Sequence, residues 1–164
     1  MQDSAAAVYA ITETWLRGDI TDGVVLKELL PPGYKIEHSP RMTRGGGVAT
    51  IHKDSLTMNN LINTTFESFE YVEGQLNTNH RLRLVVVYRP PPSAAHPVPF
   101  RDFISEFEHL LELLVVAGGE LLIVGDFNIH VDCPDAHEGK AFLDLLSSFG
   151  LVQHVKDATH RSGH

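Results

Sequence analysis

An aspartate and an amide stand two positions apart at the end of an apolar run, in the stretch LLIVGDFNIH that covers residues 121–130. Residues two apart in a β-strand point the same way, so Asp126 and Asn128 would aim at one point past the strand's carboxyl end. Ligand sites in α/β proteins commonly lie there. The oxygen-rich pair suits a hard cation such as Mg²⁺, and the carboxylate could hold or deprotonate an attacking water. Gly, Asp and Asn also favour turns, so a plain turn remains an alternative for these letters alone.

Two further apolar segments end in a polar group. Glu13 follows the apolar segment 8–12 and could be a metal ligand, although a solvated glutamate is the commoner case. Tyr88 closes the segment 81–88, and its phenol could donate a hydrogen bond to a phosphate. A core tyrosine with its hydroxyl at the surface is the alternative. The coincidence of three such strand ends favours metal–phosphate chemistry over the three separate structural interpretations.

Other constellations carry less chemistry. The segment that begins at Asp126 starts like a calcium loop, but Val131 and His137 stand where glycine and glutamate are needed. His130, Cys133 and His137 have plausible zinc spacing without an apparent fourth ligand. The triple glycine 45–47 lacks the Gly-Lys-Ser/Thr ending of a phosphate loop and is interpreted as a flexible turn.

The hydrophobic pattern alternates between strands and helices. Apolar residues at three-and-four spacing from Phe100 to Leu114 predict a helix that ends at Gly118, and a second stripe runs from Phe142 to Phe149. A short helix is expected over 22–30. This mixture predicts an α/β protein with helices packed on sheet. The expected strands cover 8–12, 45–52, 68–76, 81–88 and 120–127. The segments 68–76 and 81–88 are expected to form a hairpin. The segment 81–88 is expected to be covered on both faces, and 120–127 to be a central strand.

Length and charge narrow the class of protein. A chain of 164 residues suits one domain over residues 1–164, with enough buried surface for a real core. The net charge of -8 argues against a simple electrostatic nucleic-acid binder, although residues 41–101 are richer in arginine than the acidic part that follows. One cysteine excludes an internal disulfide framework. No apolar run is long enough to cross a bilayer, so we expect no membrane partner and an intracellular location, nuclear if the substrate is DNA.

Five short motifs occur in a fixed order: ETWL, GGGVA, YRPP, GDFN and THRSGH. Together they resemble the endonuclease/exonuclease/phosphatase superfamily, in particular the endonuclease domain of LINE-type (non-LTR) retrotransposons. The resemblance covers nearly the whole chain. It implies a DNase I-like fold, a four-layer α/β/β/α sandwich that is incomplete here, and a Mg²⁺-dependent phosphodiesterase, with Mn²⁺ as a possible substitute and DNA as the partner.

The resemblance also implies roles for individual residues. Glu13 looks like the metal-binding glutamate and Tyr88 like the phosphate-side tyrosine. Asp126 resembles the aspartate that positions the nucleophilic water and contributes to the metal site, and Asn128 its phosphate-contacting partner. Thr159 resembles a threonine near the scissile strand, and Arg89 is expected to bind substrate beside Tyr88.

The sequence departs from the family pattern at both ends. No asparagine-bearing strand precedes Glu13, and the aspartate-bearing strand and the Ser-Asp-His motif expected after THRSGH are absent. Loss of a general acid–base group costs roughly 10²- to 10⁴-fold in rate, so we expect this partial domain to cleave DNA little or not at all. The alternatives are a phosphatase of the same superfamily and a non-catalytic remnant or scaffold fragment. The sequence does not indicate the oligomeric state.

Overall fold

The computed structural model describes residues 6–40, 45–59, 62–77, 81–94, 96–133 and 136–155. Strands and helices interchange along these segments as the hydrophobic pattern predicted. In chain order the elements are β1 (Val8–Thr12), α1 (Asp22–Leu29), β2 (Tyr34–Ser39), β3 (Val48–Lys53), β4 (Met58–Asn59), β5 (Glu70–Asn77), β6 (Arg81–Tyr88), α2 (Phe100–Val116), β7 (Glu120–Asp126) and α3 (His137–Ser148).

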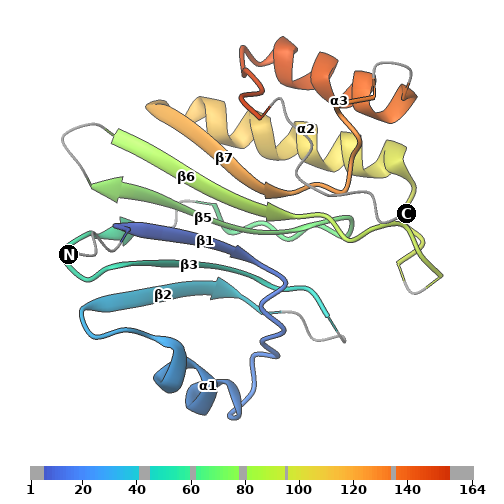
Figure 1. Ribbon diagram of the computed structural model, residues 1–164. Coiled ribbons are helices and arrows are strands. Elements are labelled where there is room, and N and C mark those ends of the chain that lie inside the picture. The colour runs from blue at the N-terminus through green and yellow to red at the C-terminus, as the bar shows by residue number, and fades with distance from the viewer. Residues whose placement is uncertain are drawn as a thin grey trace.

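The strands form two sheets that stack face to face. One sheet has the order β1-β3-β2 and is antiparallel, and the other has the order β4-β5-β6-β7 with a parallel pair at β6 and β7. Figure 1 shows α2 and α3 over the outer face of the second sheet and α1 beyond the first sheet. The layers therefore follow the order helix, sheet, sheet, helix, which confirms the predicted four-layer α/β/β/α arrangement.

The strand β6 explains how these layers hold together. Its side chains alternate, so Val85 and Val87 join a buried cluster with α2 and α3, while Leu84 and Val86 join a second cluster between the two sheets. Both faces of β6 are thus covered, as its continuous apolar sequence predicted. The cluster on the helix side includes a row of α2 side chains that repeats at three-and-four spacing, namely Phe103, Phe107, Leu110, Leu111 and Leu114.

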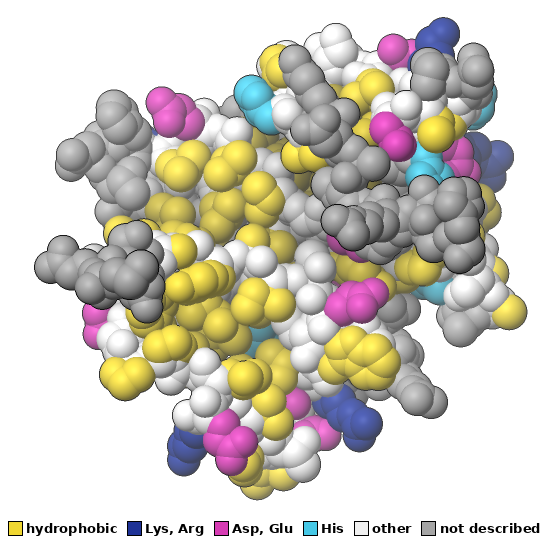
Figure 2. Space-filling model, viewed as in Figure 1, with side chains coloured by type: hydrophobic (Ala, Val, Ile, Leu, Met, Phe, Trp, Pro, Cys, Tyr) yellow, Lys and Arg dark blue, Asp and Glu magenta, His cyan; other side chains and the backbone are white. Residues whose placement is uncertain are grey.

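One sequence prediction about the sheet is wrong. The segment 120–127 was expected to be a central strand, but β7 pairs only with β6 among the described residues and has several half-exposed side chains. Leu121 and Ile123 pack against the helix-side cluster and Val124 packs against the cluster between the sheets, while Leu122 is 43% exposed. In Figure 2, hydrophobic side chains gather in the middle of the face where β1 and β7 lie. A continuous apolar sequence therefore does not by itself distinguish a central strand from an edge strand.

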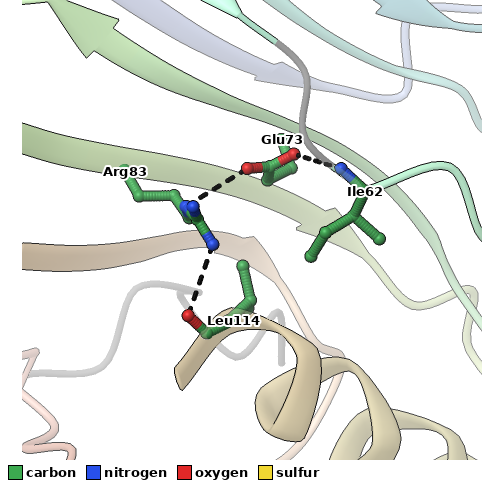
Figure 3. A network of polar contacts seen from close by, with 4 residues as sticks. All are labelled: Ile62, Glu73, Arg83 and Leu114. Carbon is green, nitrogen blue, oxygen red and sulfur yellow. Dashed lines mark hydrogen bonds and ion pairs between the residues drawn. The ribbon is translucent and has the colours of Figure 1, made fainter. Parts of the chain in front are cut away.

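A buried ion pair lies between the second sheet and α2. Arg83 Nε lies 3.3 Å from Glu73 Oε1, and both side chains are almost fully buried. Glu73 also accepts a hydrogen bond from the backbone N–H of Ile62 at 3.2 Å, and Arg83 donates to the carbonyl of Leu114 at 3.3 Å (Figure 3). The pair therefore joins β5, β6, the segment before β5 and the end of α2.

Candidate active site

Two polar side chains meet at the carboxyl ends of β6 and β7. These strands run parallel, and their register places Tyr88 beside Asp126. The backbone N–H of Arg89 continues the ladder by donating to the carbonyl of Asp126 at 2.9 Å. The carboxyl ends of neighbouring parallel strands are a common place for ligand sites. The second sheet thus presents a phenol and a carboxylate side by side.

The other sheet contributes Glu13. It follows β1 directly, with a positive φ of 54° that turns the chain away from the strand direction. The hydroxyl of Tyr88 donates to Glu13 Oε1 at 2.6 Å, so the two sheets are joined at the candidate site. Three of the residues predicted from the sequence, Glu13, Tyr88 and Asp126, are therefore brought to one place.

Tyr88 is a hydrogen-bond donor here and not a base. Its side chain is 4% exposed. Burial raises the pKa of the Tyr88 phenol well above its usual value, and the bond to Glu13 and the charges of Asp126 and Glu70 raise it further. A phenol with such a pKa keeps its proton at neutral pH, so it can donate to a carboxylate or to a phosphate oxygen.

The segment that carries Glu13 rests on the triple glycine. The N–H of Thr14 donates to the carbonyl of Gly47 at 3.2 Å, and the N–H of Trp15 donates to the carbonyl of Gly46 at 2.9 Å. Gly47 has a φ of 86°, and an added Cβ would collide with the Thr14 side chain. The interpretation of this stretch as a flexible turn was therefore incomplete, because two of its carbonyls hold the segment next to Glu13.

Asn128 lies near the site in a different way from that predicted. The strand ends at Asp126, and Asn128 has a φ of 49°, so the same-side rule for strand residues does not apply to it. Its N–H donates to Asp126 Oδ1 at 3.1 Å, as in an Asx turn, and its side-chain amide donates to the carbonyl of Arg89 at 2.8 Å. Asp126 and Asn128 thus form a turn and also lie at the candidate site, so the two interpretations of this stretch are compatible.

Arg89 lies beneath this turn. It is 2% exposed, and its guanidinium donates to the carbonyls of Phe127 and Asn128 at 3.3 and 3.2 Å. The same group stacks over the rings of Phe100 and Phe103, at 5.4 and 4.9 Å from their centroids. Burial lowers the pKa of Arg89. Its contacts support the turn from below, and substrate binding by Arg89 stays a prediction. Thr159, the other predicted substrate contact, lies outside the described residues.

Sequence reasoning missed Glu70. This residue begins β5, and the antiparallel register with β6 pairs it with Tyr88. Its Oε2 accepts a hydrogen bond from the N–H of Gly47 at 2.5 Å. The predicted hairpin of 68–76 with 81–88 contained the signal, because pairing the ends of those strands would have placed Glu70 near Tyr88.

The donors at the site fit a hydrated divalent cation held by few protein groups. Within the described ranges, no group of three or more His, Cys, Asp or Glu side chains is arranged to hold a metal. Glu13 is exposed and Asp126 is half-buried, so both carboxylates are open to solvent. Mg²⁺ is typically bound through one or two carboxylates and retains several waters. Glu13 and Asp126 are the residues that would hold it.

The four-layer fold, with carboxylates and a phenol at the strand ends, agrees with the family that the sequence itself matches. The chain belongs to the endonuclease/exonuclease/phosphatase family, whose model matches residues 1–163. No curated protein matches the sequence closely enough to be counted as a relative.

Three solved structures with a similar fold are an exonuclease, an AP endonuclease and TDP2. A 3′-5′ exonuclease (NExo) from Neisseria meningitidis has a TM-score of 0.60 at 17% identity, over 88% of this chain and 62% of that one. An AP endonuclease from Archaeoglobus fulgidus has a TM-score of 0.58 at 15% identity, over 87% and 60%. D. rerio TDP2 complexed with a single-strand DNA product has a TM-score of 0.53 at 13% identity, over 90% and 53%.

These matches establish the fold and not the substrate, because the identities are low. The chain spans 62% of the exonuclease's length and 60% of the AP endonuclease's length. Within the described residues, no helix is both long and apolar enough to cross a membrane.

Proposed function

We propose that this chain carries the site of a divalent-metal-dependent phosphodiester hydrolase that acts on DNA, of the type found in LINE-type retrotransposons. The observation that carries the proposal is the hydrogen bond from Tyr88 to Glu13, with Asp126 beside Tyr88 in the sheet register. Membership of a family that generally depends on a divalent metal supports the metal requirement. The motif order from ETWL to THRSGH supports the retrotransposon type.

Each residue has a definite task in this proposal. Asp126 accepts a hydrogen bond from the attacking water and orients it or takes its proton. Tyr88 keeps its one hydroxyl proton at neutral pH and donates it to Glu13 in the free protein; when substrate binds, it would donate that proton to a phosphate oxygen instead of to Glu13. Asn128 stands beside Asp126 and fixes its Oδ1 through a backbone bond. A bound Mg²⁺ or Mn²⁺, held by Glu13 and Asp126, would neutralise charge that develops on the phosphate.

Metal binding is tested first, through thermal stability. A ligand at about a hundredfold excess over its Kd adds about 2.7 kcal/mol to the free energy of unfolding. For a chain of this size that corresponds to an increase in Tm of roughly 5–10 °C. We expect the increase with Mg²⁺ or Mn²⁺ in the wild type at constant ionic strength, and its loss in Glu13→Gln and Asp126→Asn.

The matched control is Glu67→Gln. Glu67 is exposed and does not lie at the site, so this substitution removes the same charge elsewhere on the surface. An equal loss of the metal effect in Glu67→Gln would show that the ion acts on overall charge, which would contradict the proposed site. A wild type whose Tm does not respond to either metal would contradict it as well.

Nicking of supercoiled plasmid tests the reaction. Cleavage that requires metal and disappears in Asp126→Ala would support hydrolysis and would overturn the expectation that this chain cleaves DNA little or not at all. Metal-dependent stabilisation without cleavage would agree with that expectation. Release of phosphate from monoesters, with no nicking, would favour a phosphatase instead.

A non-catalytic remnant is the second candidate. It would have the same fold and the same Tyr88–Glu13 contact without binding metal or cleaving DNA. Absence of both the metal effect and cleavage would favour it.

A further inference from the structure

A carboxylate at the start of β5 connects the two sheets next to the candidate site. We propose that Glu70 is a positioning residue, which holds the segment carrying Glu13 at the distance from Tyr88 that the site requires. The inference rests on the proposed function for its consequence in catalysis. Its structural content can be tested without any activity.

On the side of the second sheet, Glu70 is fixed by strand pairing. It stands opposite Tyr88 in the antiparallel register of β5 and β6, and Tyr88 in turn stands beside Asp126. The three residues thus occupy neighbouring strands at one end of the sheet. Any group that Glu70 binds is therefore placed relative to both Tyr88 and Asp126.

On the side of the first sheet, Glu70 binds the backbone that supports Glu13. Glu70 Oε2 accepts the N–H of Gly47 at 2.5 Å, and the carbonyl of Gly47 accepts the N–H of Thr14 at 3.2 Å. Gly47 also lies against the Thr14 side chain, which an added Cβ would meet, so the glycine stretch and the Glu13 segment are in direct contact. A short chain of hydrogen bonds therefore runs from Glu70 through Gly47 to the residue next to Glu13.

This connection matters because apolar packing holds the two sheets together but does not determine how one sheet is aligned on the other. The buried contacts between them come from side chains such as Val48, Val72 and Val86. The hydrophobic effect that stabilises those contacts is not directional. A hydrogen bond, unlike apolar packing, has a preferred length and direction. Glu70 thus supplies the alignment that the bond from Tyr88 to Glu13 needs.

The chain contains a built-in reporter of this alignment. Trp15 is its one tryptophan, is 57% exposed and lies two residues after Glu13. The backbone N–H of Trp15 donates to the carbonyl of Gly46, so displacement of the glycine stretch changes the surroundings of the indole. Emission wavelength and acrylamide quenching of Trp15 therefore report on the Glu13 segment in the complete chain.

Two substitutions of Glu70 distinguish the effect of side-chain length from the effect of charge. Glu70→Asp keeps the charge but shortens the side chain by about 1.5 Å, one carbon–carbon bond, which breaks the contact with Gly47. Glu70→Gln removes the charge but keeps an oxygen at full reach. We expect a shift in Trp15 emission and a changed quenching constant in Glu70→Asp, and wild-type values in Glu70→Gln. Glu67→Asp, an exposed neighbour, serves as the control and should also match the wild type.

The outcomes decide the proposal. Wild-type Trp15 emission and quenching in Glu70→Asp would overturn it, and so would an equal change in Glu67→Asp or a change in Glu70→Gln as large as that in Glu70→Asp. Far-UV circular dichroism confirms that each variant is folded, and failure of Glu70→Asp to fold while Glu70→Gln folds would support the need for reach. Where cleavage is measurable, a misplacement of about 1 Å predicts up to 10²-fold lower kcat in Glu70→Asp, with recovery in Glu70→Gln.

This design separates the two proposals. A Trp15 response in Glu70→Asp, together with no metal effect on the Tm, would support the positioning contact and contradict the proposed function. A metal effect on the Tm without a Trp15 response would do the reverse.

Discussion

The buried pair of Arg83 and Glu73 gives the sharpest stability prediction. Replacing Arg83 with Met keeps much of the apolar stem but removes the guanidinium that forms the ion pair with the buried Glu73 carboxylate (Figure 3). Breaking a buried ion pair from one side costs about 3–5 kcal/mol. No discount for solvent applies, since the two side chains are 3% and 1% exposed. The change should lower the Tm by roughly 6–20 °C.

A double-mutant cycle shows whether the charge itself is responsible. Glu73→Gln keeps an oxygen that can accept the N–H of Ile62 and removes the charge. We therefore expect Arg83→Met with Glu73→Gln to be more stable than Arg83→Met alone, with a coupling free energy of about 1–3 kcal/mol. Urea unfolding followed by circular dichroism measures all four proteins, and similar m-values would show that the transitions are comparable.

The control lies on the same strand. Arg81 is exposed and stands two residues before Arg83, so Arg81→Met should change the free energy of unfolding by no more than about 0.5 kcal/mol. A cost below about 1 kcal/mol for Arg83→Met, typical of an ordinary substitution, would refute the reasoning. So would a double variant that is less stable than the single one.

Two other predictions concern the strand ends at the site. Gly125→Ala places a Cβ onto the carbonyl of Val87 at a φ of 144°, so it should cost about 2–3 kcal/mol in urea unfolding, whereas Gly23→Ala, in open space on α1, should be neutral or stabilising. Tyr88→Phe should flatten the loss of stability above about pH 10. The pKa of Tyr88 is raised in the folded chain, so its contribution is complete below the usual tyrosine pKa and is lost as pH rises beyond it. Urea midpoints measured across that range check the slope, and equal slopes in both proteins would contradict the assignment.

The sequence was informative where a periodic pattern decides the structure. The strands β1 and β6 and the helix α2 begin where their apolar patterns begin, because one face of each must be buried. The order of layers was predicted only through the resemblance of the five motifs to the endonuclease/exonuclease/phosphatase superfamily, because the hydrophobic pattern alone indicated no more than helices packed on sheet. Glu13, Tyr88 and Asp126 were found through this combination of strand end and residue type.

Other features were not predictable from local pattern. The strand β2, with the sequence YKIEHS, alternates weakly and carries charges, so it does not stand out from loop sequence. The two-residue strand β4 is defined only by its pairing with β5. Asn128 has a positive φ, and its side-chain amide donates to the carbonyl of Arg89, which follows the neighbouring strand β6. Such features arise from contacts between distant segments, which a single sequence does not display.

The bond between Tyr88 and Glu13 joins residues at the ends of strands in two different sheets. One buried cluster lies between the two sheets and the other lies under α2 and α3, and the second is the more aromatic. Partial opening that separates the β1-containing sheet would therefore break the hydrogen bond from Tyr88 to Glu13 while the cluster under α2 and α3 stayed packed. The Tyr88–Glu13 contact is thus expected to be lost on warming before α2 and α3 melt, in a local opening of the β1-containing sheet.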